Sequence, residues 1–185
     1  MHGEYSAPYR YYEDGGTRSI ARRLKRQEDA AIQKAASELS KFIPENCVLV
    51  PMPSHTGVPV AMKALCKEIA KKTHSTVIYA IQGAHRETMY AVKKRGQTLS
   101  EQELSFVQVK PLPLNKDVIV IDNVVDSGRT ALAACHAIQN GIVLAYAYTT
   151  NPKLRGLFFY KPEEMRKRLE RRQFMRSLQQ PNMKP

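Results

Sequence analysis

The sequence lacks the features that mark secreted, membrane-spanning or zinc-binding proteins. No apolar run approaches the roughly 20 residues that a membrane helix needs. The opening stretch MHGEYSAPYRYYEDGG has no apolar core of the kind found in secretory signals. The cysteines Cys47, Cys66 and Cys135 are widely spaced and match no zinc or disulfide pattern. We therefore expect a cytoplasmic protein whose cysteines are small buried side chains.

Other absences narrow the range of enzyme classes. No spacing of His, Cys and acidic residues matches a nucleophilic triad, and no metal-ligating set is predicted. The stretch CVLVPMP contains no acidic pair, which disfavours a receiver domain phosphorylated on Asp122. There is no internal repeat. The length of 185 residues, with 43% hydrophobic and 25% charged residues, suits one globular domain with a tail.

Acidic residues are in short supply relative to basic ones. Lysine and arginine number 29 against 17 acids, which gives a formal net charge of +12. The excess is strongest after residue 152, where 10 basic residues face 3 acids. Such a chain suits anionic partners: nucleic acid, a phosphate-rich ligand or an anionic membrane surface.

The periodicity of the chain predicts an α/β fold with an open, mostly parallel sheet flanked by helices. Short aliphatic runs alternate with segments of helical spacing, which is the βαβαβ order of doubly wound folds. The predicted helices are 19–42, one from about Val58, and one that begins at Thr130 and ends at the Asn-Gly pair 140–141; the predicted strands are 47–51, 75–81, 117–122 and 142–150.

The remaining segments are harder to interpret. Residues 1–17 look irregular in spite of their four tyrosines. A helix should begin at Pro162, but its apolar residues form no single face, so docking on the domain, phosphate binding and plain solvation all stay open. We expect three parts: residues 1–46 as an N-terminal arm and helix, 47–152 as the core, and 153–185 as a basic tail.

Residues 82–116 form a long connection without a strong strand pattern. Loops of this length inside compact domains are usually functional, and the capping-box spacing of Ser100 and Glu103 predicts one short helix within it. Its basic residues are compatible either with a solvated loop or with an anion clamp.

The residues most suited to binding a ligand lie at the end of the predicted strand 117–122 and in the turn that follows it. Asp122 stands at the carboxyl end of a predicted parallel strand, where open α/β sheets bind ligands. The small residues Ser127 and Gly128 then lead into a helix N-terminus, whose N–H groups and dipole attract an anion. A carboxylate beside an anion site suits the hydroxyls and the 5-phosphate of a ribose. The competing interpretation is that Asp126 or Ser127 simply caps the next helix.

The stretch VIVIDNVVDSGRT resembles the 13-residue phosphoribosyl pyrophosphate (PRPP) motif of type I phosphoribosyltransferases. The resemblance extends over about residues 47–150, and the ComF-like members are most similar in layout. It implies a PRPP-binding, Mg²⁺-dependent transferase that displaces pyrophosphate with a nitrogenous base. It also implies a flexible flap at 82–116, and by analogy a homodimer.

The resemblance assigns roles to individual residues. Asp122 and Asn123 would bind the ribose hydroxyls, and Asp126 would lie beside the reacting carbon. A hood over the base would come from residues 1–46 and the segment Phe158–Tyr160. The phosphate and pyrophosphate residues would be Ser127, Gly128, Arg129 and Thr130 for the 5-phosphate, and Ser54, His55, Thr56, Gly57, Arg86 and Lys94, with Lys93 and Arg95 nearby, for the pyrophosphate.

Two functional hypotheses stay open at this stage. The family has an acid where this chain has Asn123, and an amide stabilises less positive charge than a carboxylate. The chain is therefore either a phosphoribosyltransferase or a non-catalytic PRPP- or nucleotide-binding regulator whose basic tail contacts nucleic acid.

Overall fold

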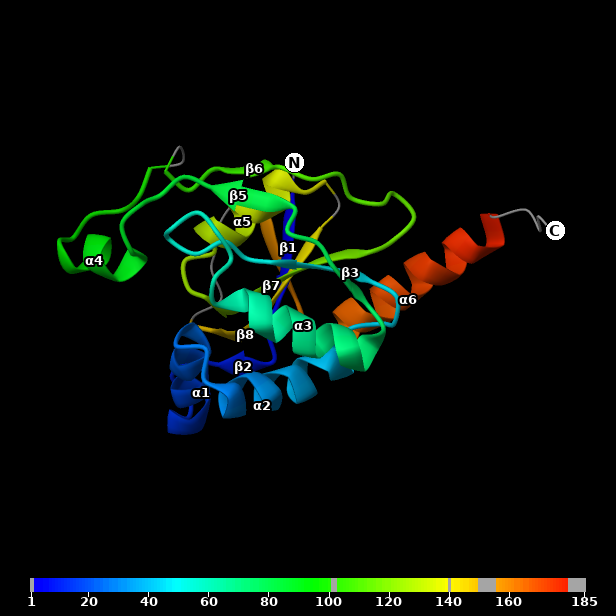
Figure 1. Cartoon of the computed structure of the whole chain (residues 1–185), viewed down its shortest axis with the longest axis horizontal. Helices are drawn as coiled ribbons and strands as arrows, with labels where there is room; N and C mark the ends of the chain where they lie inside the picture. Colours follow the sequence, from blue (N-terminus) through cyan, green and yellow to red (C-terminus); the bar gives the residue numbers. More distant parts are fainter. Residues whose placement is uncertain (1, 101–102, 140, 150–155, 180–185) are drawn as a thin grey trace.

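The structure, a computed structural model, describes residues 2–100, 103–139, 141–149 and 156–179. Its centre is a parallel sheet with the strand order β4-β3-β7-β8-β1-β9, and β2 pairs with β8 beside β1 (Figure 1). The expected open, mostly parallel sheet is confirmed. Its strands are β1 (Gly3–Ser6), β2 (Tyr9–Arg10), β3 (Val48–Pro51), β4 (Thr76–Val77), β7 (Val118–Val125), β8 (Ile142–Tyr148) and β9 (Leu157–Tyr160).

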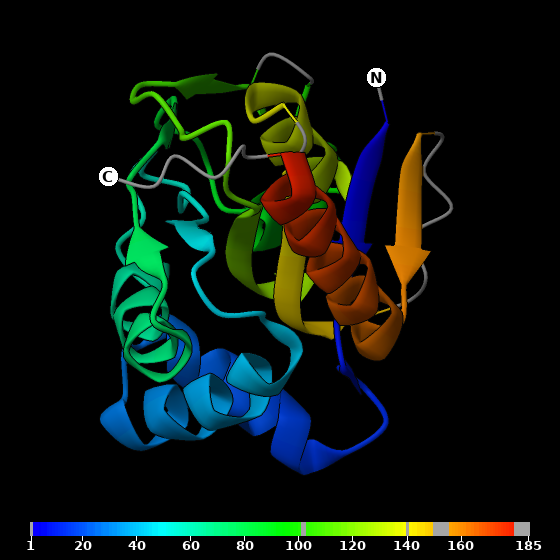
Figure 2. The same cartoon turned by 90° about the vertical axis from the view of Figure 1, so that its right-hand side faces the viewer.

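Helices cover both faces of this sheet. On one face lie α1 (Gly15–Lys25), α2 (Asp29–Leu39), the 3-10 helix η1 (Ser40–Phe42) and α3 (Met62–Thr73), and the opposite face carries α5 (Arg129–Ala137) (Figures 1 and 2). The crossovers β3–α3–β4 and β7–α5–β8 lead away from each other. The strand order therefore reverses between β3 and β7, and ligands of open α/β sheets bind at such a switch point.

Burial explains why the central strands form. Every residue of β3 and β8 is buried, as continuous aliphatic runs in a two-sided parallel sheet should be. None of the described helices combines the length and the apolar character that a bilayer crossing requires.

The expectation that residues 1–17 are irregular is wrong. The segment provides β1, which lies between β8 and β9 in the main sheet, and Tyr5 is only 1% exposed. The single helix expected over 19–42 is also wrong, because Gln27 adopts a left-handed φ of 58° and separates α1 from α2. Asp14 caps α1 by accepting a 2.7 Å hydrogen bond from the Thr17 N–H.

The predicted strand 75–81 is only partly correct. Two residues form β4, after which the chain leaves the main sheet, and β5 (Ile81–Gly83) pairs antiparallel with β6 (Phe106–Gln108). This ribbon and α4 (Met89–Lys94) make up the segment expected to be a flap, and α4 lies at the left of Figure 1, away from the main sheet. The capping bond forms, since the Ser100 N–H donates to Glu103 Oε2 at 2.7 Å, but the described residues after it form a turn and then β6, so the predicted short helix at this place is wrong.

The C-terminal helix α6 (Pro162–Gln179) begins at the predicted proline and packs on the domain. Met165 and Leu169 are buried, and Arg168 forms a 2.6 Å ion pair with Glu4 of β1. Residue 140 of the expected Asn-Gly helix end and residue 150 of the expected last strand lie outside the described residues.

Candidate functional site

The stretch that resembles the PRPP motif begins inside β7 and ends in α5. The strand is longer than expected, because Val124 and Val125 still pair with Ala147 and Tyr148 of β8. Helix α5 then begins at Arg129, so the turn between the two elements is short. Alternation along a strand sends Asp122 to the face that carries α5 and Asn123 to the face that carries α1.

Asp122 is a largely desolvated carboxylate at the switch point. Burial raises its pKa to about 6, although the N–H of Asn123 donates to Oδ1 at 2.7 Å and the charges of Lys25 and Arg86 oppose the shift. Within the described chain no cation lies at ion-pair distance from it. The side chain therefore retains acceptor capacity in a place where burying a charge is costly.

Asn123 and Asp122 point to opposite faces of the sheet. Asn123 is 7% exposed, and its Nδ2 donates a 3.2 Å hydrogen bond to the Ala21 carbonyl of α1. This position argues against the expected ribose contact, and it gives the amide the structural role of fastening α1 to the sheet. The physical reason is the continuation of β7 beyond Asp122, which keeps the two neighbouring side chains on opposite faces.

The turn itself presents backbone donors at the start of α5. Gly128 occupies the N-cap with a φ of 80°, and no side chain caps the helix. The capping role considered for Asp126 and Ser127 is therefore not found. Ser127, Arg129 and Thr130 are partly exposed around the turn, while Gly128 is buried. Uncapped N–H groups at a helix start are an anion-binding arrangement.

Asp126 is the most exposed residue of the turn and has two partners. Its Oδ1 accepts from the Thr149 hydroxyl at 2.7 Å, and its Oδ2 pairs with Lys93 of α4. Burial raises the pKa of this carboxyl, but the bonds from Lys93 and Thr149 outweigh it and the pKa lies below its usual value. Lys93 thus joins the flap segment to the turn.

The loop after β3 lies on the other side of the switch point. Ser54 Oγ and Thr56 Oγ1 are 2.7 Å apart, and the Thr56 N–H donates to Ser54 Oγ. Gly57 has a φ of 84°, and a Cβ there would lie 2.1 Å from the Gly83 carbonyl oxygen. Only glycine fits that close approach. His55 is exposed, with its ring 6.4 Å from that of His85.

Arg86 of the flap segment belongs to this loop in space. Its N–H donates to the His55 carbonyl at 2.8 Å, and its Nη1 donates to the Ser54 carbonyl at 3.1 Å. Its buried Nε has no hydrogen-bond partner within the described chain, which leaves a donor for an anion. Lys94, by contrast, is exposed at the end of α4, and its neighbour Lys93 makes the contact to the turn.

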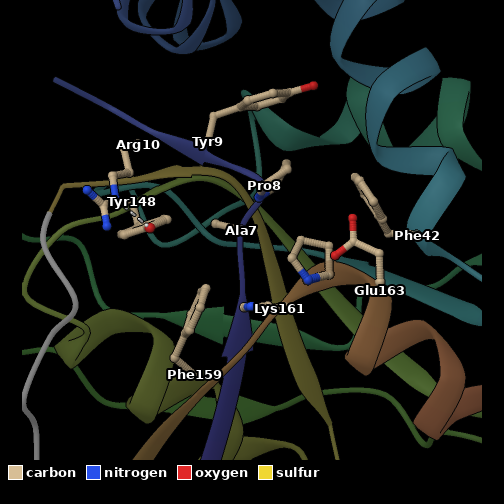
Figure 3. A pocket seen from close by; sticks show the side chains of 10 residues that line it. Ala7, Pro8, Tyr9, Arg10, Phe42, Tyr148, Phe159, Lys161 and Glu163 are labelled. Atoms are coloured by element: carbon tan, nitrogen blue, oxygen red, sulfur yellow. Dashed lines mark hydrogen bonds between the residues drawn. The ribbon is translucent and has the colours of Figure 1, made fainter. Parts of the chain in front are cut away.

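A recess of about 490 Å³ opens beside the end of β8 (Figure 3). Tyr148 of its lining pairs in register with Val125, the residue before the turn. Arg10 Nε donates to the Tyr148 hydroxyl at 3.0 Å across one wall. Neither this recess nor the one beside α6 is lined by the turn itself. Its aromatic residues are Tyr9, Phe42, Tyr148 and Phe159, and its charged residues are Arg10, Lys161 and Glu163.

Sequence reasoning missed most of this recess. The sequence predicted that the N-terminal tyrosines and Phe158–Tyr160 contribute to a hood over the base. No local sequence pattern indicated that Phe42 and Tyr148 would lie beside them. Across the described residues no group of three or more His, Cys, Asp or Glu side chains could hold a metal ion.

Comparison with solved structures finds a hypoxanthine phosphoribosyltransferase from Staphylococcus aureus in two crystal forms. The tetragonal form is 18% identical with a TM-score of 0.40, and the match covers 78% of this chain and 73% of that chain. The orthorhombic form is 15% identical with a TM-score of 0.37, over 78% and 74%. No protein-family model and no curated protein matches the chain. Likeness at this level identifies neither the reaction nor a ligand of this chain.

Proposed function

We propose that the protein binds PRPP, or a related ribose 5-phosphate, and transfers phosphoribose to a nitrogenous base with release of pyrophosphate. The observation that carries the proposal is that the uncapped start of α5 occurs together with the Asp122 carboxylate at the switch point, which no cation of the described chain neutralises at ion-pair distance. A phosphate suits the first, and the hydroxyls of a sugar suit the second. The likeness to ComF-like members rests on the sequence layout alone.

Each group has a role in this proposal. The N–H groups and hydroxyls of Ser127–Thr130 hold the 5-phosphate, and Asp122 accepts from the ribose hydroxyls. The loop Ser54–Gly57 holds the pyrophosphate together with Arg86, whose Nε donor has no partner within the described chain. Lys93 and Lys94 on α4 would close over the leaving group, and Asp126 would lie beside the reacting carbon.

The residues present fit a Mg²⁺ ion whose ligands come mainly from the substrate. This ion prefers carboxylate oxygens, keeps several waters, and rarely needs an all-protein cage. Asp122 and Asp126 are the carboxylates of the site that could reach it. When bound, Mg²⁺ supplies neutralisation of the charge that develops on the pyrophosphate.

The chain's own contribution is positioning and charge. Displacement of pyrophosphate needs the nucleophile in line behind the anomeric carbon, with the sugar held at both ends. Arg86 stabilises the leaving group in a partly buried place, where its charge acts more strongly than in water. Burial of Asp122 would let its carboxylate stabilise positive charge on the ribosyl group. Closure of α4 would keep water from that group.

The aromatic recess is our candidate for the acceptor base. Flat rings at Tyr148 and Phe159 offer stacking surfaces, and Lys161 and Glu163 offer a donor and an acceptor for ring substituents (Figure 3). Tyr148 of the recess pairs in register with Val125, the residue before Asp126, so we propose that the base approaches the turn from this side. The substrate class that this chemistry favours is a planar nitrogen heterocycle.

The test is a thermal melt with PRPP and Mg²⁺, followed by a pyrophosphate-release assay against a panel of bases. The wild-type chain should gain stability with PRPP, and Asp122→Ala should lose that gain. Gly128→Val should lose it as well, because a side chain at a φ of 80° distorts the turn. Asp29→Ala, at an exposed acid of α2, is the matched control. An unchanged PRPP shift in both site variants would refute the proposal.

A non-catalytic PRPP-binding regulator is the second candidate. The orientation of Asn123 favours it, because of the pair only Asp122 is left for the sugar. A PRPP-induced shift without pyrophosphate release from any base would select this function over transfer. The homodimer expected by analogy is tested by light scattering with and without PRPP.

A further inference from the structure

Helix α6 carries a basic stripe along one side. Its basic residues recur three and four positions apart, so successive turns place cations about 6 Å from one another along the helix axis. Together with Tyr160 of β9, the acid Glu164 and Met175, they line a recess of about 740 Å³. The residues of this stripe are Lys167, Arg168, Arg171, Arg172 and Arg176.

Acidic neighbours neutralise only part of the stripe. Glu4 lies 2.6 Å from Arg168 and 4.0 Å from Arg172, and Arg176 pairs with Asp117. Lys167 and Arg171 are exposed, and no acid of the described chain lies at ion-pair distance from either. The stripe therefore presents two unneutralised cations, one helical turn apart, above a row of half-buried arginines.

Aromatic rings border the stripe on β9. Phe158 is 49% exposed and packs edge-on against His2 at 5.4 Å between ring centroids. Tyr160 lies two residues further on the same face of the strand, and the Arg168 guanidinium stands 5.0 Å from its ring centroid. β9 is the outermost strand of the main sheet (Figure 2), so both residues belong to its edge. Cations and exposed rings are thus interleaved over one surface.

We infer that the stripe of α6 and the Phe158 ring of β9 bind single-stranded nucleic acid. Cations spaced along a helix match the repeated charge of a phosphate backbone, and an exposed ring beside them offers a base a stacking surface. A duplex would keep its bases from that ring. A membrane surface fits less well, because the exposed apolar residues Phe174, Met175 and Leu178 stand in the last turns of α6 and of these only Met175 lines the recess.

The test measures fluorescence anisotropy of labelled oligo-dT and oligo-rU of about 20 nucleotides, at about 50 mM and about 200 mM salt. The double variant Lys167→Gln/Arg171→Gln should weaken binding on the order of tenfold and flatten the salt dependence. Phe158→Ala should weaken binding roughly fivefold or more at unchanged salt slope. The matched control is Arg22→Gln/Lys67→Gln, which removes two exposed cations from α1 and α3 and should leave binding as it was.

Two further probes make the outcome decisive. Heparin that binds as tightly as the oligonucleotide, with no effect of Phe158→Ala, would reduce the surface to a general polyanion site and overturn the inference. So would binding to phosphatidylserine vesicles without any binding to oligonucleotide. A circular dichroism melt of each variant checks that α6 is still folded. No assay here contains PRPP, so the result is independent of the transferase proposal.

Discussion

Two groups of residues at the switch point are held in place by different forces. The inner group consists of Asp122, Asn123, Arg86 and the loop Ser54–Gly57. Main-chain bonds hold its loop, since the Gly83 N–H donates to the Gly57 carbonyl at 3.0 Å and Arg86 donates to the carbonyls of Ser54 and His55. Burial holds Asp122 and Asn123, and the side-chain amide of Asn123 also donates a hydrogen bond to the Ala21 carbonyl.

The outer group consists of Asp126, Thr149 and Lys93. Lys93 links it to the flap segment through an ion pair whose two side chains are each 47% exposed. Exposed pairs contribute roughly 0–1 kcal/mol, because water and salt screen them. The apolar residues Val92, Leu99 and Leu104 form a small buried cluster of their own, separate from the main core.

The two kinds of attachment indicate that the inner group is preorganised and that the outer group can detach from the turn. The inner group is fixed by interactions that ligand binding need not create, as preorganised binding sites require. The outer group can separate from the turn at small cost, and α4 would keep its own packing when it does. The proposed closure of α4 over a fixed floor is compatible with this division.

The largest effect should come from Gly57→Ala. The new Cβ would lie 2.1 Å from the Gly83 carbonyl oxygen at a φ of 84°, so both the backbone strain and the clash oppose it. We expect a loss of about 4 kcal/mol in unfolding free energy, measured by urea denaturation. Gly96→Ala is the control, because its φ is 69° and nothing lies within 4 Å of the added atom. Equal losses in the two variants would show that the main-chain attachment is unimportant.

Asn123→Asp tests the amide of the inner group. It would set a carboxylate against the Ala21 carbonyl and remove the donor that now joins them at 3.2 Å. We expect a loss of about 3 kcal/mol at neutral pH, since a buried acceptor would lack a partner. Asn46→Asp, at an exposed position, should change stability little. A stable Asn123→Asp protein with faster turnover would instead place this side chain at the ligand.

Asp122→Asn should stabilise the protein, at the expense of ligand binding. The folded pKa of about 6 lies above the ordinary 3.8, so the native state binds more protons than the unfolded chain between these values. Wild-type stability therefore falls as the pH rises from about 4 to 6. The gain in Asp122→Asn should be absent at low pH and reach at most about 3 kcal/mol above pH 6. Urea titrations at several pH values measure it, and a gain that is constant with pH would contradict the burial.

The parts of the fold that local residues determine could be predicted. Four aliphatic residues before Asp122 predict a buried strand, and the Ser-Gly-Arg-Thr turn predicts a helix start because glycine and small polar side chains suit it. The continuous apolar runs of β3 and β8 likewise predict buried strands.

The parts of the fold that depend on pairing between distant segments could not be predicted from the sequence. Strand β1 has few apolar residues, and it forms because β8 and β9, more than 130 positions later, pair with it on both sides. The inward orientation of Asn123 depends on the pairing of Val124 and Val125 with β8, although the aliphatic pair after it was a signal that the strand continues. The recess of Figure 3 gathers four separate segments, which no local pattern connects.

Asp126→Asn should show the opposite pH dependence from Asp122→Asn. The bonds from Lys93 and Thr149 keep the Asp126 pKa below its ordinary value, so its charge adds stability above the unfolded pKa and loses it as the pH falls. We expect Asp126→Asn to cost less than about 1 kcal/mol at pH 7 and nothing near pH 3. The same urea titrations measure it. A gain in stability at pH 7 would mean that the two aspartates are not distinguished by their partners.

The smallest effect should come from Lys93→Met, which removes the link between the flap and the turn. The amides of residues 126–130 and of α4 should exchange hydrogen up to about fivefold faster, because the lost pair contributes no more than about 1 kcal/mol. Residues 81–86 should keep their protection, since main-chain bonds hold them to the loop after β3. Lys94→Met is the matched control, because Lys94 is exposed on the same helix. If Lys94→Met has the same effect, or if protection at 81–86 falls together with that of α4, the inner and outer groups open as one unit and the flap has no separate hinge.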